Sequence, residues 1–189
     1  MATAPHNPPT AADLAQRVDA LCHHFVRVHT ERMAGIPLLN GALSVEAVGF
    51  EWAAQTEAGA SPVAEGVLIT PWFMSLVRLP LAVLPHGSQV GCKAVRQFGC
   101  ERFDFIGAHD EAVGYHETCA LFSPMGGFTS QVLARDTALA SLALVRPVAE
   151  PTLEPPPVPH PAPRAPVAQP VPARRSFMLG GLSRNRGVA

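Results

Sequence analysis

A proline-rich segment near the end of the chain limits how much of this sequence can fold. Between Pro147 and Ala173, 11 of 27 residues are proline and none is aromatic. Proline has no amide hydrogen to donate and favours extended polyproline backbone, so such a segment cannot bury a core. We therefore expect one folded domain built from the residues before Pro147.

The sequence divides into four parts on this basis. We expect a disordered N-terminus at 1–9, a folded domain at 10–146, a disordered proline-rich linker at 147–173, and a basic and apolar tail at 174–189. The formal net charge of −1 and the pI near 6.7 predict neither a nucleic-acid partner nor an acidic membrane surface as a partner.

The chain is also expected to be cytoplasmic, without insertion into a membrane. Residues 1–9 lack the basic and apolar regions of a signal peptide. The longest apolar stretch, 66–85, is interrupted by Pro71, Arg78 and Pro80, which a bilayer-spanning helix tolerates poorly.

Hydrophobic periodicity predicts a helix at each end of the folded domain. Thr10 is a suitable N-cap for the first, in which apolar residues recur at helical spacing to about Met33. Its polar residues, among them Arg17 and His24, are predicted on the other faces. The second helix follows Thr129 and Ser130 and runs to about Arg146.

Five segments between these helices have the composition of strands. They are rich in β-branched or alternating apolar residues and cover 43–52, 63–70, 89–98, 102–107 and 112–122. Short connections between the last three favour antiparallel hairpins. The sequence therefore predicts an α+β fold, a mostly antiparallel sheet of about five strands with the N-terminal and C-terminal helices packed on it.

The pattern offers no strong metal or catalytic site. His116 and Cys119 are three apart in a predicted strand and should point to opposite faces of the sheet, while Cys92 and Cys100 fall on different strands. The acidic and histidine residues of 109–117 include Asp110 and Glu111, which a turn would leave solvated. Nucleophile elbows and phosphate loops are absent, so we expect no enzyme and no cofactor.

A run of large apolar residues near the middle of the chain indicates a binding surface or a core. Pro71 should end a strand and turn the chain, and the stretch after it carries Trp72, Phe73, Met74 and Leu76. These residues cannot all face one core in an extended chain. A second corner, at Ser123 and Pro124, precedes Met125 and Phe128. We predict that these two sets line a partner-binding groove, with an ordinary core as the alternative.

The same residues carry a resemblance to a known family. The blocks "GVLITPWFMSLVRLP", "LPHGSQ" and "YHETCALFSPMGGFTSQVLARDTALASLAL" closely resemble the HybE/HupJ-type (HoxT-like) nickel–iron hydrogenase assembly chaperones, over roughly Leu14 to Val145. The terminal "RRSFMLGG" also looks like the segment that ends members of this family. The proline-rich insertion before it is longer than the family pattern.

The resemblance implies a non-catalytic, cytoplasmic assembly factor. Such a chaperone binds the precursor of an uptake hydrogenase before export, either the small subunit with its twin-arginine signal or the large subunit. Other maturation proteins are further partners. It acts as a proofreading factor, which holds the iron–sulfur subunit back from export until its cofactors are in place. In some lineages it is linked to protection from oxygen. The resemblance carries the apolar anchors onto Pro71, Trp72, Phe73 and Met74, and the corner onto Ser123 and Pro124.

The tail motif resembles a twin-arginine signal at the wrong end of the chain. Ten residues follow Leu179, among them Arg184 and Arg186, so the apolar run is too short for a signal. We hypothesise that the motif mimics the signal of a client and competes for the same apolar groove. Its residues are Arg174, Arg175, Phe177, Met178 and Leu179.

Two other functions stay open at this point. The first is a metal- or redox-active maturation factor that protects or delivers a cluster through Cys92, Cys100, Cys119 and His116. The second is an adaptor whose proline-rich tail recruits a partner while the folded domain anchors it.

Overall fold

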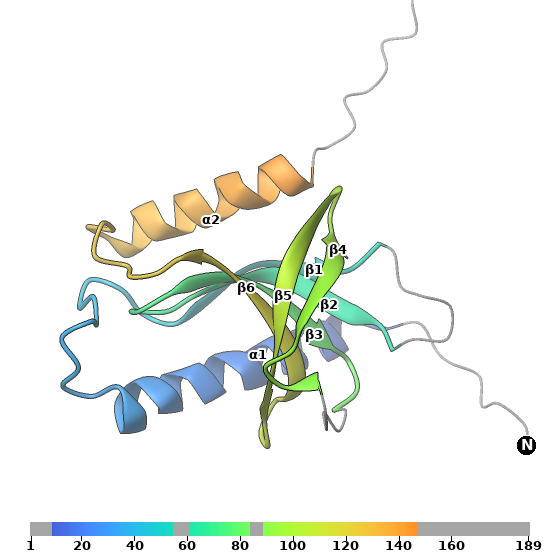
Figure 1. Cartoon of the computed structure of the whole chain (residues 1–189), viewed down its shortest axis with the longest axis horizontal. Coiled ribbons are helices and arrows are strands. Elements are labelled where there is room, and N and C mark those ends of the chain that lie inside the picture. Colours follow the sequence, from blue (N-terminus) through green and yellow to red (C-terminus); the bar gives the residue numbers. More distant parts are fainter. Residues whose placement is uncertain (1–8, 55–60, 84–88, 147–189) are drawn as a thin grey trace, which may run out of the picture. The chain divides into compact units, whose positions relative to one another are not determined.

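A six-stranded antiparallel sheet lies between two helices in the computed structural model, which describes residues 9–54, 61–83 and 89–146 (Figure 1). The strand order is β1-β2-β3-β6-β5-β4. The strands are β1 Glu46–Trp52, β2 Val63–Ile69, β3 Met74–Pro80, β4 Lys93–Phe98, β5 Glu101–Asp110 and β6 Gly114–Phe122. The predicted α+β class is confirmed, and so are the β4–β5 and β5–β6 hairpins.

Helix α1 (Ala11–Arg27) begins where the sequence predicts. Thr10 and Asp13 form a reciprocal capping box: the Thr10 amide donates to Asp13 Oδ2 over 2.8 Å, and the Asp13 amide donates to Thr10 Oγ1 over 3.2 Å. The Thr10 hydroxyl, which donates to Asp13 Oδ2 over 2.7 Å, and the Thr10 amide hold the pKa of the Asp13 carboxyl below its usual value. The helix continues as a short π-helix, η1 (Val28–Arg32), to the predicted end near Met33.

The buried side of α1 differs from the prediction. Leu21 packs on the sheet as expected, but Arg17 and His24 are also buried, although the sequence placed them on other faces. Arg17 is buried because Nε donates to the Pro80 carbonyl over 3.0 Å and Nη2 to the Val113 carbonyl over 2.8 Å. Helical periodicity assigns polar residues to solvent and cannot anticipate such carbonyl acceptors.

We expect Arg17→Met to lower the free energy of unfolding by roughly 2–3 kcal/mol. Methionine keeps most of the apolar contact but leaves the Pro80 and Val113 carbonyls without the donor that holds these strand ends against α1. Urea unfolding followed by circular dichroism measures the change. An unchanged free energy would mean that water replaces both bonds at no cost.

Strand β3 is missing from the prediction, which counted about five strands. Its residues are buried on both faces of the sheet, with Arg78 as the least buried. A strand covered on both faces reads as an unbroken apolar run, without the alternation that marks a strand exposed on one side. The sequence therefore predicts Met74 and Leu76 as apolar residues after a turn. In the structure they belong to a strand that pairs with β2 and β6.

Helix α2 (Gln131–Val145) covers the face of the sheet opposite α1 (Figure 1). It starts at the predicted N-cap Ser130, whose Oγ accepts the Leu133 amide over 3.2 Å. The buried residues of α2 pack with those of the sheet in one cluster, which contains Val67, Ile69, Met74, Leu76, Phe98, Phe105, Ala134, Ala138, Leu142 and Val145. A second cluster, around Leu21, fills the space between the sheet and α1.

Two histidines between α1 and the sheet should make the fold sensitive to acid. Burial lowers the pKa of both His24 and His116 below the ordinary value, although Asp110, whose Oδ1 lies 3.1 Å from His24 Nδ1, opposes this shift. Arg17 also faces His116 and adds to its lowered pKa.

We expect the free energy of unfolding to fall as the pH drops below about 6.5, because the unfolded imidazoles take up protons there and the folded ones do not. This contribution is fully present above the unfolded pKa and decreases toward the lower folded pKa. Urea titrations across this range measure it. His116→Phe should flatten the profile, because it removes one of the two imidazoles whose pKa is lowered by burial.

Candidate functional site

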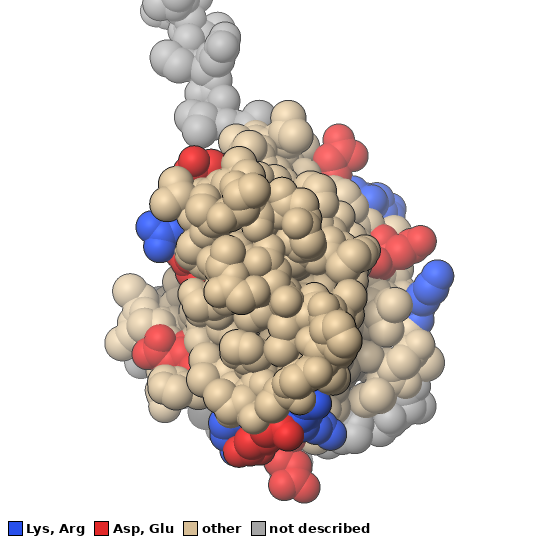
Figure 2. All heavy atoms as spheres, turned by 90° about the vertical axis from the view of Figure 1, so that its left-hand side faces the viewer, with Lys and Arg blue, Asp and Glu red and all other residues tan. Residues whose placement is uncertain are grey.

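Three stretches of the chain that contain no charged residue meet at one end of the sheet. They are 33–45 between η1 and β1, 66–77 around the β2–β3 turn, and 118–134 from β6 into α2. The loops of these stretches lie on the left-hand side of Figure 1. Figure 2 looks at that side and shows a broad area free of Lys, Arg, Asp and Glu, with charged side chains around its margin.

Hydrogen bonds hold these stretches together. The backbone amide of Asn40 donates to the Pro71 carbonyl over 2.9 Å. Its side-chain amide donates to the carbonyls of Met125, over 3.0 Å, and Phe128, over 2.7 Å. Farther along, Gln131 Oε1 accepts the Ser44 amide over 2.9 Å. The loops therefore form one continuous surface.

Large apolar side chains are exposed on this surface. Ile36, Leu38, Phe122 and Leu133 have relative exposures of 39%, 47%, 41% and 44%. Trp72 and Phe128 are partly exposed, and the Phe128 ring meets the Phe122 ring edge-to-face at 5.3 Å. We call these six residues the docking face: Ile36, Leu38, Trp72, Phe122, Phe128 and Leu133. A contiguous apolar area without charges is typical of a protein-binding site.

The β2–β3 turn fixes the position of Trp72. Thr70 Oγ1 accepts the amides of Trp72, over 3.3 Å, and Phe73, over 2.9 Å, and the Thr70 amide donates to the Phe73 carbonyl over 2.8 Å. The Trp72 ring then lies 6.0 Å from the ring of His29 and 6.4 Å from that of Phe25. Trp72 therefore connects the π-helix at the end of α1 with the turn.

The residues predicted to line the groove divide into two sets. Met74, Leu76 and Met125 have at most 1% of their surface exposed and belong to the α2-side core, and Pro71 is buried as well. A partner that docks on this conformation cannot reach them. Trp72, Phe73 and Phe128 are partly exposed, and Ser123 and Pro124 lie exposed where the chain leaves β6. The predicted tail residues 174–179 lie outside the described residues.

Several docking-face residues were missed by the sequence prediction. Ile36 and Leu38 were assigned to a connecting loop, and Phe122 and Leu133 to a strand and a helix. A usable signal was present, because 33–45 is a long loop without any charge in a chain that is 15% charged. Loops exposed to water normally carry polar and charged residues, so such a loop indicates contact with something apolar.

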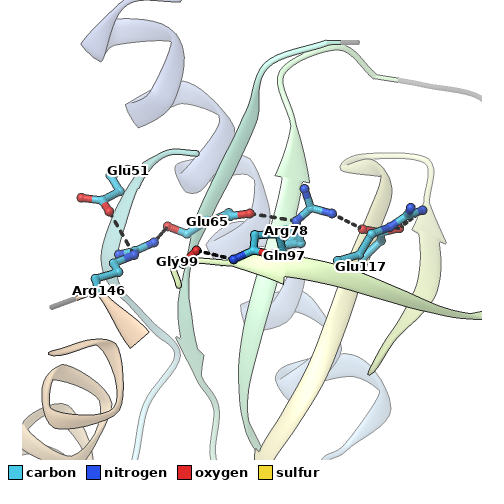
Figure 3. Close-up of polar contacts among 8 residues, drawn as sticks. Glu51, Glu65, Arg78, Gln97, Gly99, Glu117 and Arg146 are labelled. Carbon is cyan, nitrogen blue, oxygen red and sulfur yellow. Dashed lines mark hydrogen bonds and ion pairs between the residues drawn. The ribbon is translucent and has the colours of Figure 1, made fainter. Parts of the chain in front are cut away.

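A network of ion pairs crosses the sheet beyond the apolar core (Figure 3). Arg78 on β3 donates to Glu65 on β2 over 2.9 Å and to Glu117 on β6 over 3.1 Å. Arg96 on β4 donates to Glu117 over 2.9 Å. Burial raises the pKa of Glu65 even though Arg78 stabilises its charged form.

A pocket of about 430 Å³ lies beside this network, at the C-terminal end of α2. Its lining includes Glu51, Glu65, Cys100 and Arg146. The polar groups have partners within the chain: Arg146 pairs with Glu51 over 3.0 Å and donates to the Glu65 carbonyl over 2.7 Å. Because the acidic and basic side chains of the network and of the pocket pair with one another, we assign them a structural role.

The residues of the metal or redox alternative are spread over the described part of the chain. His116 contacts the Phe25 ring on the α1 side of the sheet, and Cys119 packs against the α2-side core, so the predicted opposite orientation is confirmed. Among residues 9–54, 61–83 and 89–146, no three His, Cys, Asp or Glu side chains gather as they would around a metal ion. Burial raises the pKa of the Cys22 and Cys119 thiols, which makes their thiolates rarer.

The chain is similar to curated proteins along most of its length. It is 42% identical over 174 residues to protein HoxT of Cupriavidus necator, covering 87% of this chain and 88% of that protein. It is 31% identical over 180 residues to the hydrogenase expression/formation protein HupJ of Bradyrhizobium diazoefficiens, covering 95% and 97%. The solution structure of HybE from Escherichia coli matches 88% of this chain and 91% of that one, with 19% identity and a TM-score of 0.49.

No helix among the described residues has the length and apolar character needed to cross a membrane. A sequence model of the family described as "NiFe-hydrogenase assembly, chaperone, HybE" matches residues 16–180. The matched range covers the folded domain from residue 16 onward and extends through the RRSFML motif. The chain therefore belongs to the HybE family of nickel–iron hydrogenase assembly chaperones.

Proposed function

We propose that this protein is a non-catalytic chaperone that binds the precursor of an uptake nickel–iron hydrogenase in the cytoplasm and retains it until assembly is complete. The observation that carries this proposal is the docking face, an exposed apolar area without charges (Figure 2). In a protein that works alone such a surface favours aggregation, whereas a chaperone needs it to cover apolar segments of its client.

The small-subunit precursor is the favoured client. Its twin-arginine signal contains an apolar segment, which suits the aromatic and aliphatic side chains of the docking face. The large-subunit precursor and other maturation proteins are further candidates. Binding of the unfinished small subunit would delay its export and shield its iron–sulfur sites from oxygen.

Co-purification tests the proposal. A tagged full-length chain would be isolated from cells that make a hydrogenase whose export is blocked, and bound proteins would be identified by mass spectrometry. We expect the small-subunit precursor in stoichiometric amount. A matched strain in which that precursor lacks its signal separates recognition of the signal from recognition of the folded subunit. Tagged protein that carries no hydrogenase subunit would refute the proposal.

A metal analysis of the same purified protein addresses the alternative function. The metal- or redox-active alternative requires a stoichiometric ion that is lost on replacement of Cys119. The adaptor reading requires that deletion of the residues after Ala149 abolishes precursor capture. We expect a chain with an intact docking face to retain it.

A further inference from the structure

Asn40 makes three of the hydrogen bonds that join loop 33–45 to the stretches 66–77 and 118–134. Besides its three bonds to Pro71, Met125 and Phe128, its Oδ1 accepts the Ala42 amide over 3.0 Å and its carbonyl accepts the Leu43 amide over 3.1 Å. The side chain therefore uses two donors and an acceptor at once, and it is only partly exposed.

The three side-chain bonds, to Met125, Phe128 and Ala42, require an asparagine. Only a primary amide offers two N–H donors together with a carbonyl acceptor, and the longer glutamine would place them differently. An aspartate keeps the acceptor for Ala42 but has no donor, and it would turn a negative charge toward the carbonyls of Met125 and Phe128.

Two exposed residues of the docking face depend on this arrangement. Ile36 and Leu38 stand just before Asn40, in two successive turns closed by the bonds Ile36 N–H to Met33 carbonyl and Leu39 N–H to Ile36 carbonyl. After Asn40 the chain is anchored separately, because Leu43 is buried in the core and the Ser44 amide is held by Gln131. Loss of the Asn40 side-chain bonds to Met125 and Phe128 should therefore loosen Ile36 and Leu38 without unfolding the domain.

We propose that Asn40 is the positioning residue of the docking face, which holds Ile36 and Leu38 in register with Phe122 and Phe128 before a partner arrives. The inference rests on the proposed function, since it assigns Asn40 a role in client binding. A surface that is already ordered loses less conformational entropy on binding, so a loosened loop weakens the complex even when every apolar side chain is still present.

The experiment compares Asn40→Asp and Asn40→Ala with Arg17→Met in the full chain. Arg17 is a matched control, because it also donates two side-chain bonds to backbone carbonyls, but at the opposite ends of β3 and β6. Amide hydrogen exchange and the melting temperature would be measured for each chain without a partner. The dissociation constant for the small-subunit precursor would then be measured at a temperature well below all of the melting temperatures.

Both Asn40 variants should speed amide exchange in 33–45 and 122–130 and raise the dissociation constant at least about tenfold. Arg17→Met should lower the melting temperature and change the dissociation constant by less than about twofold. Equal affinity of the Asn40 variants and the wild type overturns the positioning role while the proposed function stands. A wild-type chain that captures no precursor overturns the proposed function itself, although the effect on exchange would still be seen.

Discussion

Leu38→Asp and Phe122→Asp should each weaken binding of the hydrogenase precursor by roughly 100-fold, because each would bury an unpaired carboxylate in an apolar contact. Both side chains are more than one-third exposed, so the carboxylate remains hydrated in the free protein and the domain should fold. The dissociation constant, measured by titrating labelled precursor, gives the effect, and circular dichroism verifies the fold.

Ile106→Asp is the control for this pair. Ile106 lies on β5, outside the docking face, with a relative exposure of 44% that is close to those of Leu38 and Phe122. It pairs in the sheet with Lys93, which tolerates an added carboxylate. If this variant loses as much affinity as the other two, the precursor binds elsewhere or the loss reflects a general effect of charge.

The largest loss of stability is expected for Arg78→Met, at about 3–5 kcal/mol. Arg78 has 14% of its side chain exposed and is the cation shared by Glu65 and Glu117, whose side chains are 6% and 8% exposed. Methionine fills similar space but leaves the Glu65 carboxylate without its cation and Glu117 with Arg96 alone. Urea unfolding of the full chain measures the difference.

Two comparisons identify the cause of that loss. Replacing Glu65 and Glu117 by Gln in the Arg78→Met background removes the stranded charges and should restore part of the stability. Arg135→Met removes the ion pair between Arg135 on α2 and Glu46 on β1. It should lower the free energy of unfolding by about 1 kcal/mol or less, since the Arg135 side chain is 57% exposed. Similar losses of stability for Arg135→Met and Arg78→Met would show that the buried cross-sheet network contributes no more than an exposed ion pair.

The parts of the fold set by local sequence could be predicted. Thr10 and Ser130 cap helices within a residue or two of the expected starts, because N-cap hydrogen bonds involve only neighbouring residues. The hairpins among β4, β5 and β6 also depend on short connections. Strand β3 was not recognised, because its residues are buried on both faces of the sheet and so lack the alternation of a strand exposed on one side.

The structure separates the residues predicted to line a groove into exposed and buried ones. Trp72 and Phe128 were expected at a partner-binding surface and are partly exposed at the docking face, whereas Met74 and Met125 fill the core. Residue type could not separate them, since methionine and phenylalanine suit both environments. The role of Asn40 could not be predicted from the sequence, because the carbonyls that accept its hydrogen bonds, at Met125 and Phe128, lie 85 and 88 residues away along the chain.

The division between loops and core has a consequence for how such chaperones diversify. Most docking-face residues come from connecting segments or from the first and last residues of regular elements, and none of them belongs to the two buried clusters as a core member. Changes confined to the exposed residues of these segments, with Leu43 and Met125 kept in the core, therefore leave the interior packing intact. Grafting the exposed residues of 33–45 and 123–130 from one relative onto another should transfer hydrogenase specificity between them.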